Sequence, residues 1–253
     1  MLNLLNYPFL IPAFSLFIFW ISARIGASLR GKQSSTQTDD HEDFTLILGA
    51  TLTLLGLIIG FTFSMAVTRY DQRKYFEEQE ANAIGTEYVR ADLLPTADAA
   101  RVRTLLRRYL DHRILHYKAR NEQQLQKINT ETDQLQTEMW AAVKTPAATR
   151  PTPVAALIIA GMNDVLNSQG YTQFAWRNRV PPAAWILSVT IAILCNLLVG
   201  YVAHRKSALL FLILPIVLSI SFFLIADIDS PRGGLIHLSP QNLEGLAESI
   251  GWH

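Results

Sequence analysis

The chain has 253 residues, enough for one or two domains, and half of them are hydrophobic while only 17% are charged. A soluble domain has about a quarter of its residues charged, so the composition favours a membrane protein. The formal net charge is +1, and most of the 22 lysines and arginines lie between Arg69 and Arg179. The clustering predicts a water-exposed region in the middle of the chain, and we expect no nucleic-acid partner. Because Cys195 is the only cysteine, an intramolecular disulfide and a cysteine-rich zinc site are excluded.

Four apolar stretches are long enough to cross a hydrocarbon core, which needs about 20 apolar residues in a helix. They cover residues 4–23, 44–68, 183–203 and 207–226. Only His204, Arg205 and Lys206 join the last two, which predicts that these helices are antiparallel neighbours. The first stretch could also be a cleaved signal peptide. We favour a retained span, because no basic residue precedes it, the apolar run is long, and Pro8 and Pro12 stand near its start.

The region between the second and third spans is predicted to be helical. The second span has no proline before Pro95, so we expect its helix to continue well past residue 68. Thr96 or Asp98 can cap the next helix, which we expect to end near Arg120. A further helix then places apolar residues in a short seam; these are Leu125, Ile128, Leu135 and Met139.

Later elements follow from prolines and glycines. Residues 144–153 are predicted to be a proline-rich break, and residues 154–168 a core helix rather than a fifth span. Residues 227–239 contain two glycines and a proline and are expected to be rich in turns, and residues 240–250 to form a short amphipathic helix. We therefore divide the chain into a first span pair (1–68), a helical extramembrane domain (69–180), a second span pair (181–226) and a tail (227–253).

Enzyme motifs are missing from the sequence, which has no GxSxG, HExxH, Walker or Rossmann pattern. His112 and His116 have the spacing of two metal ligands on one helix face, but lack an obvious third, so we expect no metal site and no cofactor. Asp227 and Asp229 follow the fourth span, and we favour a simple polar stop to the helix or a pair with Arg232. They could also form a cation site, a turn or, as the least favoured reading, the site of a membrane hydrolase. The spans contain almost no ionisable group, which argues against ion-coupled transport and permits a pore with an apolar constriction.

The second span carries two patterns of interest. Small residues at positions that let another helix approach closely, within or between subunits, are Gly49, Gly56 and Gly60. A stripe at four-residue spacing, with about 40° of drift per step, consists of Thr53, Leu57 and Phe61. Repeated around a symmetry axis, this stripe would give stacked rings, although ordinary helix packing would explain the pattern equally well.

Several longer motifs resemble a known family. They are GFTFSMA (60–66), RYDQR (69–73), EANAIGTEYVRADLLP (80–95) and DIDSPRGGLIHLSPQ (227–241). Together they look like the bestrophin-like family of bacterial and plant membrane proteins. More distantly, Leu54-Leu55-Gly56, Gly60-Phe61 and Arg69-Tyr70 resemble the second span of the bestrophin anion channels.

The resemblance implies an all-α fold of four spans with a cytoplasmic helical domain, assembled as a symmetric homo-oligomer that is pentameric in true bestrophins. It also implies a hydrophobic neck, which falls on Thr53, Leu57 and Phe61, where Thr53 departs from an apolar neck. The acidic calcium site of animal bestrophins is largely absent after the fourth span.

The leading hypothesis is a passive channel for inorganic anions such as chloride, and not an enzyme. It would lie in a bacterial inner membrane, in contact with lipids, with both termini and the central domain in the cytoplasm. Basic residues flanking the spans do not decide this orientation, since six would lie on one side and five on the other. The alternative is a non-conducting scaffold or sensor whose helical domain binds a partner through the 125–139 seam.

Overall fold

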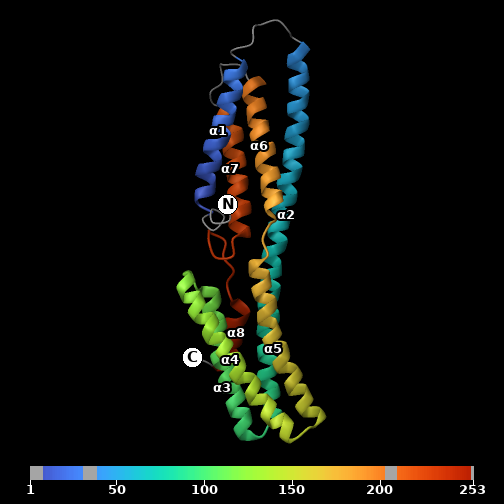
Figure 1. Ribbon diagram of the computed structural model, residues 1–253, viewed down its shortest axis with the longest axis vertical. Helices are drawn as coiled ribbons and strands as arrows, with labels where there is room; N and C mark the ends of the chain where they lie inside the picture. Colours follow the sequence, from blue (N-terminus) through green and yellow to red (C-terminus); the bar gives the residue numbers. More distant parts are fainter. Residues whose placement is uncertain (1–7, 31–38, 203–209, 252–253) are drawn as a thin grey trace. The chain divides into compact units, whose positions relative to one another are not determined.

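The computed structural model of the chain describes residues 8–30, 39–202 and 210–251. Within these ranges the regular secondary structure is entirely helical (Figure 1). The helices are α1 (Leu10–Arg30), α2 (Asp39–Arg90), the 3-10 turn η2 (Ala91–Leu93), α3 (Thr96–Lys118), α4 (Glu122–Thr149), α5 (Pro153–Arg177), α6 (Pro182–Val202), α7 (Leu210–Asp229) and α8 (Gln241–Ser249).

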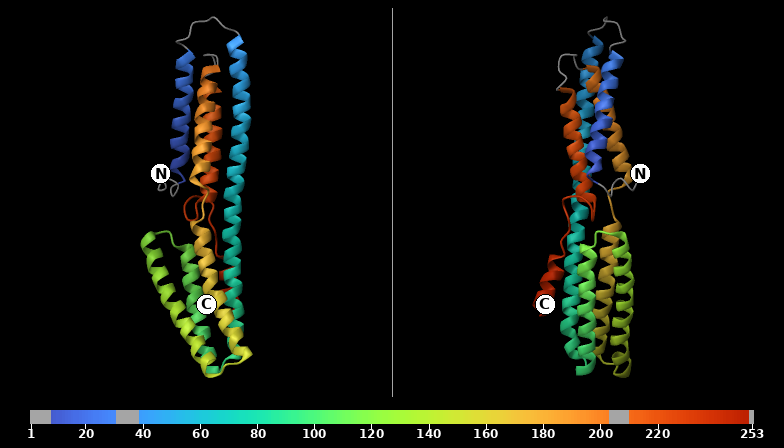
Figure 2. Two further views of the ribbon diagram at one scale, coloured as in Figure 1. Left: turned by 45° about the vertical axis from the view of Figure 1, so that its right-hand side comes forward. Right: turned by 90° about the vertical axis from the view of Figure 1, so that its left-hand side faces the viewer.

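The chain forms two compact units. The first comprises Met1–Tyr70 and Arg179–His237, and the second Asp71–Asn178 and Leu238–His253. Helices α1, α6 and α7 and the first part of α2 belong to the first unit. The remainder of α2 lies with α3, α4, α5 and α8 in the second, and the views of Figure 2 show the helices of each unit running alongside one another.

Four helices are long and apolar enough to cross a membrane, as the sequence predicts. The first apolar segment, Leu10–Leu29, ends later than its predicted end at Ala23. Arg24 therefore lies inside α1 rather than beyond it, and its guanidinium lies 5.6 Å from the centre of the Trp20 ring. Residues 4–7 of the predicted first span lie outside the described residues.

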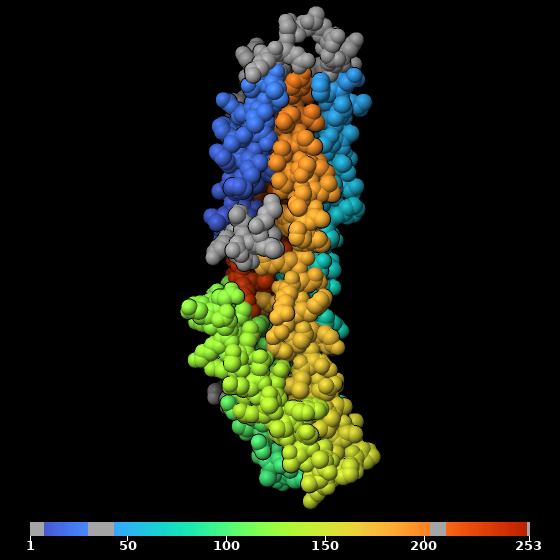
Figure 3. All heavy atoms as spheres, in the orientation of Figure 1, coloured from blue at the N-terminus to red at the C-terminus, as the bar shows by residue number. Residues whose placement is uncertain are grey.

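The first unit is held together by close packing of α1 against α6 and α7. A methyl group added at Gly26 would overlap with the carbonyl oxygen of Leu197, and one added at Gly200 with that of Ala23. The absence of both side chains lets the α1 and α6 backbones touch, as small residues do between membrane helices. Figure 3 shows α1 and α6 packed along one face of this unit.

An apolar core fills the first unit. Its most buried members come from each spanning helix and include Phe19, Leu55, Ala192, Cys195 and Phe222. The Phe19 and Phe222 rings meet edge to face with their centres 5.5 Å apart, a favourable geometry for aromatic pairs. Cys195 is thus an apolar core residue with no exposed surface.

Two local predictions for the second unit are wrong. Helix α3 begins at Thr96, but Pro95 occupies the capping position and no side chain caps it. Helix α4 passes through Pro146 to Thr149, although residues 144–153 were expected to break it. The helix ends only three residues beyond the proline, and the Thr149 hydroxyl donates to the carbonyl oxygens of Thr145 (2.9 Å) and Pro146 (3.0 Å), which satisfies acceptors in its last turn.

Other expectations hold. Helix α2 runs without interruption past Gly85, α8 closely matches the predicted tail helix, and α3 ends two residues before Arg120. Residues 154–168 lie within the longer helix α5. The second half of the α4 seam is packed within the unit, since Leu135 is 2% exposed and Met139 has no exposed surface, whereas Leu125 and Ile128 are partly exposed.

Candidate functional site

The spanning part of α2 is the least covered of the four candidate spans. Only 6% of its most apolar window is buried, against 28%, 33% and 44% in the other three. Leu55, Thr62 and Ala66 make up its buried face. At about 100° per residue, Thr53 and Leu57 then point almost directly away from that face. Leu57 is 53% exposed and Phe61 62% exposed, so the stripe identified in the sequence lies on the open side of the helix.

Thr53 is the one hydroxyl on this stripe. Its Oγ1 donates to the carbonyl oxygen of Gly49 at 2.9 Å, four residues earlier on the same helix. Because the hydroxyl proton is already engaged, the side chain presents a methyl group and an acceptor oxygen to its surroundings. Thr53 is therefore less polar towards its surroundings than a threonine with a free hydroxyl, and it differs less from an apolar constriction residue.

The three glycines of the second span lie beside the stripe on the same open side. A methyl group added at Gly49, Gly56 or Gly60 would meet no atom of the described residues within 4 Å. Within the protomer, close helix approach occurs instead at Gly26 and Gly200, which the sequence patterns did not single out. A packing role for the three α2 glycines would thus have to involve another copy of the chain.

The part of α2 in the second unit buries charged side chains beside the apolar Ala81 and Ile84. Glu80 and Arg113 have no exposed surface, and their side chains form an ion pair with a second contact of 3.3 Å between Nη2 and Oε2. The Thr172 hydroxyl of α5 donates to Glu80 Oε2 at 3.1 Å. This network joins α2, α3 and α5. The Tyr109 and Tyr117 hydroxyls lie near it, and burial, reinforced by the Glu80 carboxylate, raises the pKa of both.

Two further buried side chains of α2 form hydrogen bonds with the backbone at the ends of other helices. Arg73 donates from Nε to the carbonyl oxygen of Ala175 (3.3 Å) and from Nη2 to that of Asn178 (3.4 Å), at the C-terminal end of α5. Glu77 accepts from the backbone N–H groups of Asn242 and Leu243, both at 3.0 Å. These are orphan donors in the first turn of α8.

Asp227 and Asp229 form hydrogen bonds that shape the segment after α7. Asp227 accepts from the backbone N–H groups of Leu235 (2.6 Å) and Ile236 (2.9 Å). Asp229 accepts from the N–H of Val180 at 2.9 Å. Asp227 therefore holds the turn that follows α7, whereas Asp229 joins the end of α7 to the residues that precede α6. Burial lowers the pKa of Arg179, and Asp229 opposes that shift.

The described residues contain no group of three or more His, Cys, Asp or Glu side chains arranged to hold a metal ion. His112 Nδ1 lies 3.6 Å from Glu131 of α4, a partner that the sequence did not reveal. His116 Nδ1 lies 3.2 Å from Asn129 Oδ1 and its ring meets that of Trp176 edge to face. Both histidines therefore contribute to packing between helices of the second unit.

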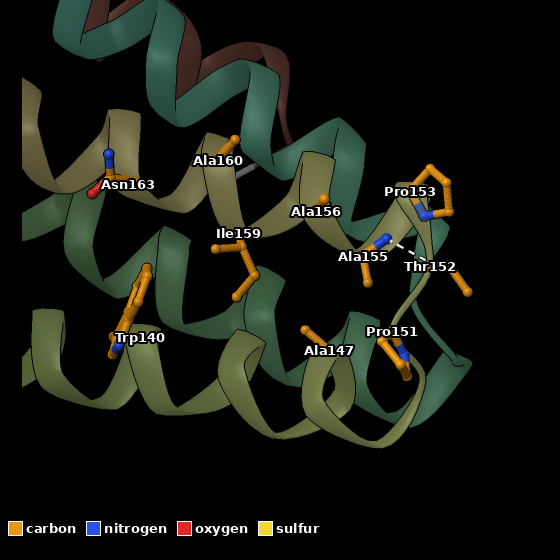
Figure 4. Close-up of a pocket in the computed structure, with 10 residues that line it drawn as sticks. All are labelled: Trp140, Ala147, Pro151, Thr152, Pro153, Ala155, Ala156, Ile159, Ala160 and Asn163. Carbon is orange, nitrogen blue, oxygen red and sulfur yellow. Dashed lines mark hydrogen bonds between the residues drawn. The ribbon is translucent and has the colours of Figure 1, made fainter.

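A shallow apolar cavity of about 640 Å³ lies between α4 and the start of α5 (Figure 4). Trp140 stands at one end, Pro151 and Pro153 at the other, and Ile159 between them. Its wall is otherwise mostly alanine and contains no charged residue. It lacks the convergent polar groups of a specific ligand site.

These features define an all-helical membrane protein with four candidate spans and a compact unit of further helices. Residues 9–243 match the Bestrophin-like domain, so the chain belongs to this family, as its motifs predict. The match includes all four candidate spans and the helices between them. No curated protein matches the chain.

Solved structures share the fold. A bacterial bestrophin homologue from Klebsiella pneumoniae gives a TM-score of 0.64 at 15% identity over 95% of this chain and 99% of that one. A point mutant of it gives 0.66 at 12% identity, with coverage of 94% and 98%. A structure described as a membrane protein gives 0.65 at 14%, also with coverage of 94% and 98%. These likenesses confirm the predicted bestrophin-like fold.

Proposed function

We propose that the protein is a passive anion channel formed by symmetric assembly of several copies, five as the family resemblance implies. The observation that carries this proposal is the open side of α2, where a stripe of Thr53, Leu57 and Phe61 lies exposed on an otherwise apolar span. An apolar helix face with few partners inside its own protomer is suited to line an axis shared with other copies.

The stripe would act as a hydrophobic constriction. Successive positions lie about 6 Å apart along the helix, so a symmetric assembly would stack three rings of side chains. Rings of leucine and phenylalanine can block ions by excluding water, without any charged gate. Residues 44–68 contain no charged side chain that would bind an ion tightly, which supports passive conduction.

The experiment is chloride flux from liposomes that contain the purified protein. We expect Leu57→Ala combined with Phe61→Ala to increase the flux by at least about tenfold, because removing the large side chains lowers the barrier to hydration. The matched control is Phe17→Ala on α1, which also removes an exposed apolar ring (59% exposed) but lies off the proposed axis. Absence of chloride flux from both the wild type and the double variant would refute conduction.

The same proposal gives the orientation. The second unit and both chain ends would lie in the cytoplasm, in keeping with the family resemblance and independently of the flanking charges. A cysteine placed at exposed Asn121, in a Cys195→Ser background, should react with an impermeant maleimide only after the cytoplasmic side is opened. Labelling of this cysteine in intact cells would show that the second unit lies outside the cytoplasm and would contradict the proposed orientation.

A further inference from the structure

Four buried ionisable side chains lie along one side of α2 in the second unit, and three of them have partners. Arg73 contacts carbonyl oxygens at the end of α5, Glu77 the first turn of α8, and Glu80 the guanidinium of Arg113. Glu87 is the fourth and has no exposed surface. Neither of its carboxyl oxygens has a hydrogen-bond partner among the described residues. An unpaired buried carboxylate is costly, so this group requires an explanation.

Gly161 of α5 provides the space that Glu87 occupies. A methyl group added at Gly161 would overlap with Oε2 of Glu87 and with Nη1 of Arg90. Thus the Glu87 carboxyl lies directly against the α5 backbone, and α2 and α5 touch at this point. Gly161, Arg90 and Asp164 also line a cleft of about 480 Å³ between the two helices.

The charges around Glu87 do not offset its burial. Arg90 on the same helix attracts the carboxylate and Asp164 on α5 repels it. On α3, Arg103 is engaged by the Tyr88 carbonyl oxygen and by Asp92. Burial, with Arg90 opposing and Asp164 adding, raises the pKa of Glu87 to about 8. The side chain is therefore a neutral carboxylic acid at neutral pH, and this form tolerates the contact with α5.

We propose that Glu87 and Gly161 form a proton-coupled latch between α2 and α5: the protonated acid lets the two helices pack, and loss of the proton releases α5 from α2. In the released state the carboxylate regains its hydration. The latch lies wholly in the second unit and operates whether or not the protein conducts ions.

Linkage fixes the direction and the pH range. The packed state holds the proton up to about pH 8, whereas an exposed glutamate has a pKa of 4.5. Between these values the packed state binds more protons than the released state, so the opening equilibrium rises about tenfold per pH unit. Below about pH 4.5 and above about pH 8 the two states bind equal numbers of protons at this site, and the dependence levels off.

Hydrogen exchange of the α5 amides around Gly161 in the full-length protein tests the latch. Wild type and Glu87→Gln are compared at each pH, so that the intrinsic pH dependence of exchange cancels. Glutamine has the shape of the protonated acid and does not ionise. We expect the ratio of wild-type to variant exchange to rise about 50-fold from pH 6 to pH 8 and to level off above about pH 9.

Two further variants keep the result specific. Glu78→Gln removes an exposed carboxylate from the same helix and should follow the wild type at every pH. Gly161→Ala removes the space for Glu87, so α5 should exchange rapidly at all pH values with no step. If Glu87→Gln does not fold, the α3 amides of the wild type provide the reference. A ratio that stays constant between pH 6 and pH 8 would overturn the proposal.

Discussion

Individual buried charges in the second unit are stabilised by partners from distant parts of the chain. The Glu80–Arg113 pair has no contact with solvent, so both charges lose their hydration on folding. That loss is tolerated because the carboxylate faces two guanidinium nitrogens and also accepts from Thr172. Burial lowers the pKa of Arg113, but the attraction and hydrogen bond of Glu80, together with the effects of Tyr109 and Tyr117, outweigh burial and leave the pKa above its usual value.

We predict that Arg113→Leu lowers the free energy of unfolding by about 3–5 kcal/mol, because it leaves Glu80 charged and buried without its partner. Adding Glu80→Leu to this variant should recover most of the loss. The Thr172 hydroxyl would keep an acceptor, since it also donates to the carbonyl oxygen of Ser168 at 3.1 Å. Denaturant unfolding in detergent measures both values. A double variant as unstable as the single one would show that the pair itself is not the cause.

Gly234 illustrates a different requirement, a backbone conformation combined with lack of space. Its φ of +91° is one that side chains disfavour, and an added methyl group would overlap with Oδ1 of Asp227. We predict that Gly234→Ala lowers the free energy of unfolding of the protein by more than about 2 kcal/mol. Gly251→Ala is the matched control, because its φ is +68° but nothing described lies within 4 Å. The Gly251→Ala substitution should lower the free energy of unfolding by about 1 kcal/mol. Equal losses in the two variants would exclude the overlap with Asp227 as a cause.

The N-terminus of α8 is capped by a side chain from another helix. Pro240 stands at the capping position of α8 and has no side chain able to accept a hydrogen bond. Glu77 of α2 fills this role with a carboxylate at the positive end of the helix dipole. Glu244 of α8 forms an ion pair with Lys118 of α3, with 2.7 Å between Nζ and Oε1. Both contacts fix the first turn of α8 to the second unit, and Arg107 of α3 donates to the Ile250 carbonyl oxygen at its other end.

We predict that Glu77→Gln weakens the attachment of α8 by about 1–2 kcal/mol, because a neutral amide loses the interaction with the dipole. Limited proteolysis of the full-length protein should then cleave near residue 240 at least about fivefold faster. Glu78→Gln, one residue further along α2 and exposed, should leave the cleavage rate unchanged. Equal cleavage rates in all three proteins would contradict the capping role.

Much of the helical architecture follows from local patterns in the sequence. Runs of apolar residues predict the spans, and the lack of prolines before Pro95 predicts the length of α2. Pro146 does not end α4 because a proline removes only one N–H donor, and only three helical residues follow it. The burial of charged side chains on the later part of α2 could not be predicted, for another reason. Its charges are tolerated only through partners on α3, α5 and α8, and no local pattern specifies those partners.

The candidate pore stripe was predictable and the latch was not. Four-residue spacing places Thr53, Leu57 and Phe61 on one side of any α-helix, whatever surrounds it. Glu87 has no such signature, since a glutamate in a polar helix is normally exposed. A clue exists in the spacing of Arg73, Glu77, Glu80 and Glu87, which place four ionisable groups on one side of α2. Only the tertiary contact with Gly161 shows that this side is buried.

The whole molecule retains the fold of solved bestrophin homologues at only 12–15% identity. Such divergence is possible because four apolar spans and a set of amphipathic helices can be specified by many sequences. The open side of the spanning part of α2 has few packing contacts within the protomer, since only 6% of its most apolar window is buried. Glycines and apolar side chains alternate on that side, and the former would allow close approach of α2 to a neighbouring copy.

We therefore predict that Gly60→Leu weakens assembly and leaves the protomer fold intact. Nothing described in the protomer lies within 4 Å of a methyl group at this position, so a large side chain meets an obstacle only where another copy packs. Mass measurement in detergent should show at least about a tenfold shift towards smaller species, with unchanged helical content. Gly170→Leu, at an equally open position of α5, should assemble like the wild type. If Gly60→Leu assembles fully, the open side of α2 near Gly60 faces lipid or water, and the subunit contacts must lie on other helices.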